Sequence, residues 1–364
     1  MKGFSTPVFS ILTSLIAVTL ACSPEKIVRR TIIQNQERGI EVTATLQDAD
    51  RITTVLCGTA SPLAQGGSQS CTAVFVNGLF LLFDAGDGAM SSIRGSGLPL
   101  GDLDAVFITH YHNDHFADLG EVMEMSWIFG RRHILPIHGP TGITQIVDGF
   151  QSAYELERSY RTAHHGEELM PPEWSPSESV EFAPPPDDSA VLVYDHNDVT
   201  VSAFRVNHSP IVPSVGYRIE YAGNAIVISG DTVRTTSLLE HSRNADLLVA
   251  EVMNMGIVEL MEGVRKETGN TFNAEILLDV RDYHMDVGEV GALAEDANVA
   301  RLALTHLAPK LPAERLMKTL YRYPVEAIYS GELFVGEDGM QIVIPVPCEN
   351  DDTSRPPPCS MSSA

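Results

Sequence analysis

Apolar and polar positions follow one another in short blocks along the chain, and these blocks predict both strands and helices. Apolar runs bounded by turn residues predict strands at 52–57, 71–76, 79–85, 105–108, 134–140, 199–206, 216–221, 225–229, 246–252, 301–304, 327–330 and 340–344. Apolar residues recur at helical spacing in 118–129, 143–154 and 286–298. The turns Asn77-Gly78 and Gly223-Asn224 predict two hairpins. This mixture of elements indicates an α/β protein.

Two segments lack this regular pattern. Residues 22–50 are polar with scattered apolar positions and are expected to form a tether or a loosely packed arm. Six of the 22 prolines lie between Pro171 and Pro186, which predicts a long irregular loop over 160–190. His164 and His165 at its entry are expected to be exposed, with substrate contact in a lid as the alternative. One folded domain is expected over 51–347, followed by a Pro- and Ser-rich tail over 348–364.

The N-terminus resembles a secretory signal. Lys2 is the only early charge, and the apolar run that follows, from Val8 to Ala21, is too short to span a bilayer. Residues 1–21 are therefore predicted to be a signal peptide. The sequence Thr19-Leu20-Ala21-Cys22 resembles a bacterial lipoprotein cleavage box, although Thr19 stands where leucine is usual. We expect a lipid anchor on Cys22 and a place in the periplasm or cell envelope, with plain secretion as the alternative.

Charge and cysteine content narrow the function classes. The formal net charge is −24 and no run of residues is basic, which argues against nucleic acid as a partner. If Cys22 carries lipid, four cysteines remain, an even number that suits an oxidising compartment. Cys348 and Cys359 flank the tail, and Cys57 and Cys71 flank one glycine-rich loop, so each pair is a candidate disulfide. Free buried thiols are the alternative for the second pair.

The densest candidate chemistry is the hexapeptide His110-Tyr111-His112-Asn113-Asp114-His115, which directly follows a predicted buried strand. Imidazole and carboxylate are good ligands for zinc and similar ions. Four such groups within six residues cannot all wrap one ion, but they can serve two adjacent ions. Further ligand-type residues follow predicted strands at His208, Asp231 and His306. Each of these alone has a structural explanation as a capped turn or a hydrogen-bonded core histidine.

The spacing His110-x-His112-x-Asp114-His115 resembles the metal motif of the metallo-β-lactamase superfamily, in the branch of ribonuclease Z and the arylsulfatase-like hydrolases. The resemblance runs from about Thr54 to Ile344. It implies a four-layer αββα sandwich. It also implies two divalent ions, with zinc expected and manganese or iron also suited to the ligands. One ion would be held by His110, His112 and His208, the other by Asp114, His115 and His306, with Asp231 bridging both. A carboxylate of the stretch Asp84-Ala85-Gly86-Asp87-Gly88 would support the ligands, with a plain turn as the alternative.

The resemblance also implies catalytic roles. A hydroxide bridging the two ions would be the nucleophile, Asp114 would orient it, and His284, 22 positions before His306, would act on the scissile group or the leaving oxygen. A surface histidine at a helix start is the alternative for His284. Two features depart from ribonuclease Z. Ala250-Glu251 stands where a His-Glu pair is usual, so the contact to His284 is expected to differ. The basic, glycine-rich arm that holds tRNA is missing, and the acidic, proline-rich loop is taken to correspond to it.

These features lead to a ranked set of functions. The first is an exported, two-metal hydrolase of phosphate or sulfate esters, similar to arylsulfatases and phosphodiesterases, acting on a small-molecule ester. The alternatives are a ribonuclease Z-type tRNA 3′-end endonuclease and a lactone hydrolase. A metal-binding protein without turnover is least favoured, because all seven ligand positions are filled. The oligomeric state stays open, with a homodimer among the options.

Overall fold

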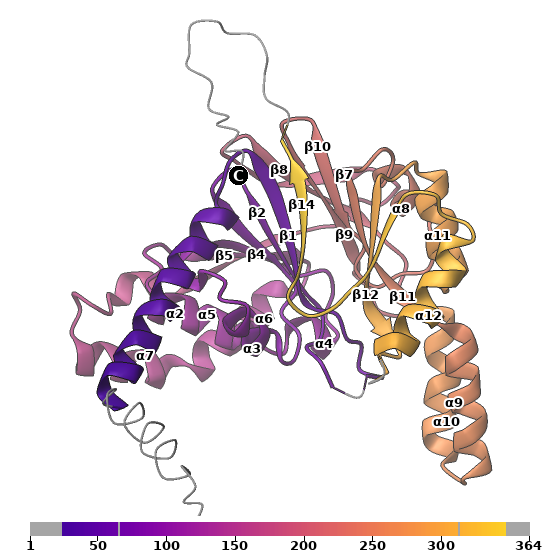
Figure 1. Ribbon diagram of the computed structural model, residues 1–364, viewed down its shortest axis with the longest axis horizontal. Coiled ribbons are helices and arrows are strands. Elements are labelled where there is room, and N and C mark those ends of the chain that lie inside the picture. Colours follow the sequence, from indigo (N-terminus) through magenta and orange to yellow (C-terminus); the bar gives the residue numbers. More distant parts are fainter. Residues whose placement is uncertain (1–23, 65, 312–313, 347–364) are drawn as a thin grey trace, which may run out of the picture. The chain divides into compact units, whose positions relative to one another are not determined.

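The computed structural model describes residues 24–64, 66–311 and 314–346, and two seven-stranded sheets form most of the domain (Figure 1). The first sheet has the order β14-β1-β2-β3-β4-β5-β6. Its strands are β1 (Arg51–Gly58), β2 (Cys71–Val76), β3 (Leu79–Phe83), β4 (Leu103–Phe107), β5 (Leu135–Pro140), β6 (Ser177–Phe182) and β14 (Met340–Pro345). The second has the order β13-β12-β11-β10-β9-β8-β7. Its strands are β7 (Ala190–His196), β8 (Val199–Arg205), β9 (Val215–Tyr221), β10 (Asn224–Ile228), β11 (Leu247–Met253), β12 (Arg301–Ala308) and β13 (Glu332–Val335).

The two sheets pack face to face over a shared apolar core. Phe107 of the first sheet and Tyr217 of the second meet with ring centroids 5.6 Å apart, and both side chains are fully buried. Helices lie outside the two sheets, most of them against the outer faces (Figure 1). They are α3 (Ala89–Gly95), α4 (Asn113–Phe116), α5 (Leu119–Ile128), α6 (Ile143–Ala153), α7 (Glu155–His165), α8 (Thr236–His241), α9 (Met255–Glu267), α10 (Thr271–Asp279), α11 (Val287–Asp296) and α12 (Glu314–Glu326), with short 3₁₀ turns η1 (Leu100–Asp102), η2 (Pro172–Trp174) and η3 (Val280–Asp282). The expected αββα sandwich is confirmed.

The prediction of an irregular loop over 160–190 is wrong in part. The first residues of that range belong to α7, and β6 occupies Ser177–Phe182 as the edge strand of the first sheet. The prolines do not prevent this, because none of them lies within α7 or β6. The strand expected at 327–330 is not found there, because those residues form a turn after α12 and the strand β13 begins at Glu332. His164 and His165 are exposed, as expected, but in the last turn of α7 rather than in a loop.

The N-terminal segment forms a separate unit that ends at Thr45. Where a tether or loose arm was expected, residues Pro24–Leu46 form the helix α2. The predicted signal peptide, Cys22 and the cysteines of the tail lie outside the described residues. Among the residues that the structure describes, no helix combines the length and apolar character needed to cross a membrane.

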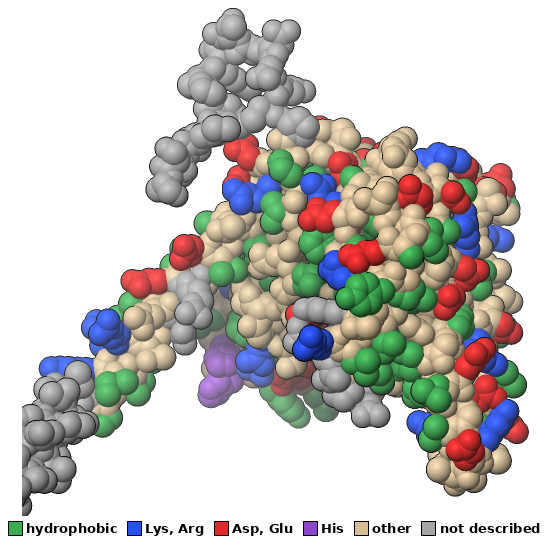
Figure 2. All heavy atoms as spheres, turned by 45° about the vertical axis from the view of Figure 1, so that its right-hand side comes forward, with side chains coloured by type: hydrophobic (Ala, Val, Ile, Leu, Met, Phe, Trp, Pro, Cys, Tyr) green, Lys and Arg blue, Asp and Glu red, His purple; other side chains and the backbone are tan. Residues whose placement is uncertain are grey.

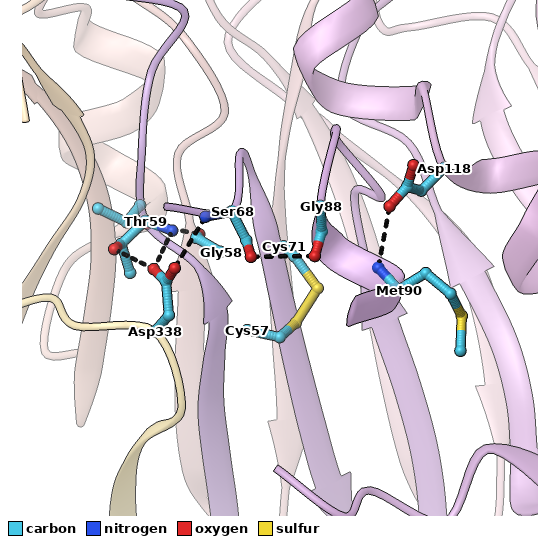
Figure 3. Close-up of a disulfide and its surroundings, with 10 residues drawn as sticks. Cys57, Gly58, Thr59, Ser68, Cys71, Gly88, Met90, Asp118 and Asp338 are labelled. Carbon is cyan, nitrogen blue, oxygen red and sulfur yellow. Dashed lines mark hydrogen bonds between the residues drawn. A yellow bond between two sulfur atoms is a disulfide. The ribbon is translucent and has the colours of Figure 1, made fainter. Parts of the chain in front are cut away.

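The glycine-rich loop between β1 and β2 is fastened at both ends (Figure 3). Cys57 and Cys71, both buried, form a disulfide across its base, which is the first of the two arrangements left open for this pair. Farther along the loop, the Asp338 carboxylate accepts hydrogen bonds from the Thr59 amide at 3.1 Å, the Thr59 hydroxyl at 2.6 Å and the Ser68 amide at 2.8 Å. The loop is thereby held against the segment that leads into β14.

Removing this disulfide is expected to lower the free energy of unfolding substantially. The bond joins residues 14 apart, and closing a loop of about 15 residues contributes ~3 kcal/mol, chiefly by restricting the unfolded chain. Chemical denaturation of Cys57→Ala/Cys71→Ala against the parent protein measures the loss. Reductant should destabilise the parent far more than the double variant. Equal stability of the two proteins would show that the bridge contributes nothing.

Candidate metal centre

The predicted ligands meet where strands of the two sheets end. The hexapeptide follows β4, His208 follows β8, and Asp231 follows β10. Gly230 is required before Asp231, because its φ of 59° is left-handed and a Cβ there would lie 2.8 Å from the Val215 carbonyl oxygen. The chain can therefore turn sharply at the end of β10 and direct Asp231 back towards the histidines.

His306 reaches the site through a bulge in β12. Glu251 of β11 pairs with Thr305, and the next residue of β11 pairs with Leu307, so His306 is the extra residue between them. Its φ of 45° is left-handed, which is unusual for a residue with a Cβ. A bulge redirects a side chain, and here it turns the imidazole out of the regular alternation and towards Asp231.

The first cluster contains three imidazoles and one carboxylate. The His112 Nδ1 atom lies 3.1 Å from His110 Nε2 and 3.2 Å from His208 Nε2. The Asp231 Oδ2 atom lies 3.9 Å from both Nε2 atoms. Four ligands at ~2.0–2.1 Å from a tetrahedral zinc ion are ~3.3 Å apart. The spacing of these atoms therefore suits one divalent ion.

The second cluster shares Asp231 with the first. Its Oδ2 atom lies 3.3 Å from both His115 Nε2 and His306 Nε2. The Asp114 Oδ2 atom lies 3.0 Å from His306 Nε2 and 3.6 Å from His115 Nε2. All four side chains are buried. The buried Asp231 Oδ1 atom has no hydrogen-bond partner, so this oxygen is available to a cation. The paired clusters suit a dinuclear metal site.

Outer contacts fix which nitrogen faces the centre in two of the imidazoles, those of His115 and His208. His115 Nδ1 lies 2.8 Å from the Asp84 carboxylate, which also accepts a hydrogen bond from the Thr109 amide at 2.8 Å. His208 Nδ1 donates to the carbonyl oxygen of Tyr283 at 3.0 Å. With Nδ1 protonated, each Nε2 keeps its lone pair for a cation. Within the stretch 84–88, Asp84 is therefore the carboxylate that supports a candidate ligand.

The electrostatics of the two clusters differ. Burial lowers the pKa of His208 to about 4 and the pKa of His110 well below its ordinary value. Burial opposes protonation of His115 and His306 as well, but Asp231 and the neighbouring carboxylates outweigh it and raise the pKa of both imidazoles. The second cluster therefore has a negative potential that favours any cation, whether a proton or a metal ion.

A third group lies beside the clusters and contains Glu251, His284 and His306. His284 Nδ1 is 3.3 Å from Glu251 Oε2, although the two atoms are not aligned for a hydrogen bond. The other oxygen of Glu251 accepts a hydrogen bond from the Met285 amide at 2.9 Å. Sequence reasoning treated Glu251 only as half of an altered pair. A single acidic residue within the apolar strand β11 is the signal that could have singled it out.

An open cleft of about 210 Å³ leads to this centre. His112, Asp114, Asp231, His284 and His306 all contribute to its lining. His284 is therefore placed where it could contact a substrate beside the metal clusters. The structure brings together all eight predicted site residues, and their roles as ligands and catalyst stay predictions. The exposed His164 and His165 are not part of this lining.

Comparison with known proteins agrees with this geometry. The family model described as a beta-lactamase superfamily domain matches residues 81–307. Ribonuclease Z from Mycobacterium bovis (strain BCG / Pasteur 1173P2) is 32% identical over 287 residues, which are 78% of this chain and 95% of the relative. Ribonuclease Z from Mycolicibacterium paratuberculosis is 31% identical over 300 residues, covering 81% and 99% of the two chains.

Solved structures support the fold. The metallo-beta-lactamase fold protein YhfI from Bacillus subtilis superposes with a TM-score of 0.57 at 22% identity, covering 81% of this chain and 100% of that one. The short form of human tRNase Z superposes with a TM-score of 0.56 at 23% identity, covering 81% and 99%. At these identities the likeness concerns the fold alone.

Proposed function

The chain belongs to the metallo-β-lactamase superfamily, and we propose that it is a metal-dependent phosphodiester hydrolase that cuts RNA as ribonuclease Z does, at the 3′ end of a tRNA. The observation that carries this proposal is the match to ribonuclease Z along 95% of that relative's length. The buried clusters and the adjacent His284 agree with it, because they join candidate metal ligands to a candidate acid–base residue.

The side chains divide the work of hydrolysis. Two divalent ions at this site would supply Lewis acidity and lower the pKa of water towards ~7. Asp114 lines the cleft and can accept a hydrogen bond from the attacking water. His284 can donate a proton to the leaving oxygen, and Glu251 at 3.3 Å can stabilise the protonated imidazole. These roles require both histidine and carboxylate to be held rigidly, which the Met285 amide does for Glu251.

A small-molecule phosphate or sulfate ester is the second candidate substrate, cleaved by an exported enzyme. Two observations favour it. The net charge is −24, and the face in Figure 2 shows Lys and Arg scattered among acidic side chains rather than gathered in one patch. The Cys57–Cys71 disulfide is typical of proteins in an oxidising compartment, whereas tRNA maturation is intracellular. Export itself rests on the predicted signal peptide and lipid anchor at Cys22.

A substrate panel tests the proposal on the metal-loaded protein. A tRNA precursor with a 3′ extension, bis(4-nitrophenyl) phosphate, 4-nitrophenyl sulfate and a lactone are compared. We expect the precursor to be cut at the 3′ end and the diester to be hydrolysed. Turnover of the small esters with an intact precursor would favour the second candidate, and mass spectrometry showing a lipidated Cys22 would strengthen it. Activity on the lactone alone would contradict both.

A further inference from the structure

We infer that the α9–α10 hairpin forms one wall of a subsite that binds an uncharged planar ring attached through the scissile ester. This inference rests on the proposed ester hydrolysis, and it adds the chemical class that the cleft selects. Helices α9 and α10 lie side by side and project beyond the second sheet (Figure 1). The sequence pattern did not predict them, and the activity proposed above assigns them no role.

One wall of the cleft is apolar. Its apolar lining residues are Pro62, Leu63, Met253, Ile276, Val280 and Ala308, and the uncharged Ser61 and Asn113 also line the cleft. Two of the apolar residues come from the hairpin and its end, and two from the loop that the disulfide closes. A cavity of ~150 Å³ with apolar walls accommodates benzene. The cleft of about 210 Å³ therefore has room for one ring next to the ester.

The same wall offers little to a charged group. Among the described residues, no Lys or Arg lines the cleft. Arg281, which follows the hairpin, is engaged by Glu259 at 2.9 Å and Glu262 at 3.5 Å. Over 255–282 there are six acidic residues and three basic ones, a net charge of −3. A second phosphate near this wall would be repelled and left unpaired, whereas a neutral ring would gain apolar contact.

Tyr283 adds an aromatic surface at the cleft. It lies in the lining, and its ring meets the His208 ring edge-on with centroids 4.7 Å apart. Its backbone carbonyl accepts a hydrogen bond from His208 Nδ1, and this contact holds Tyr283 beside the metal clusters. Aromatic side chains stack on any planar ring, which includes both a nucleobase and an aryl alcohol. The two sources share this chemistry, and the experiment separates them.

Ile276 is the specificity-determining residue that this geometry singles out. It is 42% exposed on α10 and lies in the lining of the cleft. Leu278, two residues further along the same helix, is 47% exposed and is not part of that lining. Residues two apart on a helix do not face the same way. Ile276→Asp and Leu278→Asp therefore form a matched pair, alike in exposure and charge change, of which only one alters the wall.

The preference for a second ring is measured with two esters that share the same leaving group. The metal-loaded protein is assayed with bis(4-nitrophenyl) phosphate and methyl 4-nitrophenyl phosphate, and the ratio of kcat/KM is corrected for their ratio in water. We expect a corrected preference of roughly 10-fold or more for the diaryl ester, as apolar pockets give for small differences in apolar surface. Ile276→Asp should remove most of it, and Leu278→Asp should leave it unchanged. An unchanged preference in Ile276→Asp would overturn the inference.

Binding provides an answer even without turnover. Calorimetry on the metal-loaded protein compares phenylphosphonate, methylphosphonate and adenosine 3′-monophosphate. Tighter binding of phenylphosphonate than methylphosphonate, reduced about 10-fold by Ile276→Asp, supports the ring subsite, whereas equal or absent binding refutes it. If adenosine 3′-monophosphate binds more tightly than phenylphosphonate, the ring is identified as a nucleobase. If it binds more weakly, the ring is identified as an aryl group. If neither ester is hydrolysed, the calorimetry still decides the subsite, and cleavage of the tRNA precursor decides the proposed activity separately.

Discussion

Asp231→Ala is expected to lose most of its bound metal and all measurable turnover. The Oδ2 atom of Asp231 lies within 3.9 Å of a nitrogen from each of four histidines, so one carboxylate belongs to both clusters. Removing it takes the only carboxylate from the first cluster and one of the two carboxylates from the second. The parent protein, purified without chelator, should contain about two divalent ions per chain by elemental analysis.

Asp188→Ala is the control for this change. Asp188 is exposed, so its replacement alters the net charge equally without touching the clusters, and its metal content should match the parent. Circular dichroism should show that both variants are folded. Two ions retained by Asp231→Ala would refute the bridging role. A parent protein that stays metal-free after supplementation with zinc and manganese would refute the dinuclear site itself.

Much of the fold was predictable because its strands are buried and short. The strands of the central core appear in the sequence as apolar runs, and the Asn77-Gly78 turn marks its hairpin without reference to tertiary structure. The elements that were missed depend on context. Strand β6 is Ser-Glu-Ser-Val-Glu-Phe, which has only two apolar residues and becomes a strand by pairing with β5. Its stability comes from a neighbour that no local pattern reveals.

The site was predictable for a different reason. Three histidines and an aspartate in one hexapeptide are rare enough to indicate metal ligands, whereas Glu251 is a single acidic residue within an apolar strand. Its position beside His284 depends on contacts of β11 with residues 285–286, where the Glu251 carboxylate accepts a hydrogen bond from the Met285 amide and Met253 pairs with Asp286. Such contacts between distant segments have no signature in the sequence. The cleft wall escaped prediction similarly, because Ile276 and Leu278 look alike until the hairpin is placed.

His284→Ala is expected to keep both metal ions while turnover falls by roughly 10²–10⁴-fold, the usual contribution of a general acid or base. The geometry predicts that metal content and turnover respond differently to this change. His284 belongs to neither of the two four-residue clusters, but it lies beside them in the cleft, with its Nδ1 atom 3.3 Å from Glu251 Oε2. Glu251→Gln should lower turnover less, because it removes only the negative charge beside His284 and leaves the imidazole itself in the cleft. The exposed His165→Ala serves as the control.

The leaving group then identifies what His284 does. A proton donor matters most when the leaving oxygen is basic, so an alkyl ester should lose far more activity in His284→Ala than a nitrophenyl ester. A residue that only binds the scissile group would affect both esters equally. Steady-state rates on the two esters, with metal content measured on the same samples, distinguish these cases. Loss of metal in His284→Ala would make the residue a ligand or a fold element, and full activity on both esters would exclude it from the reaction.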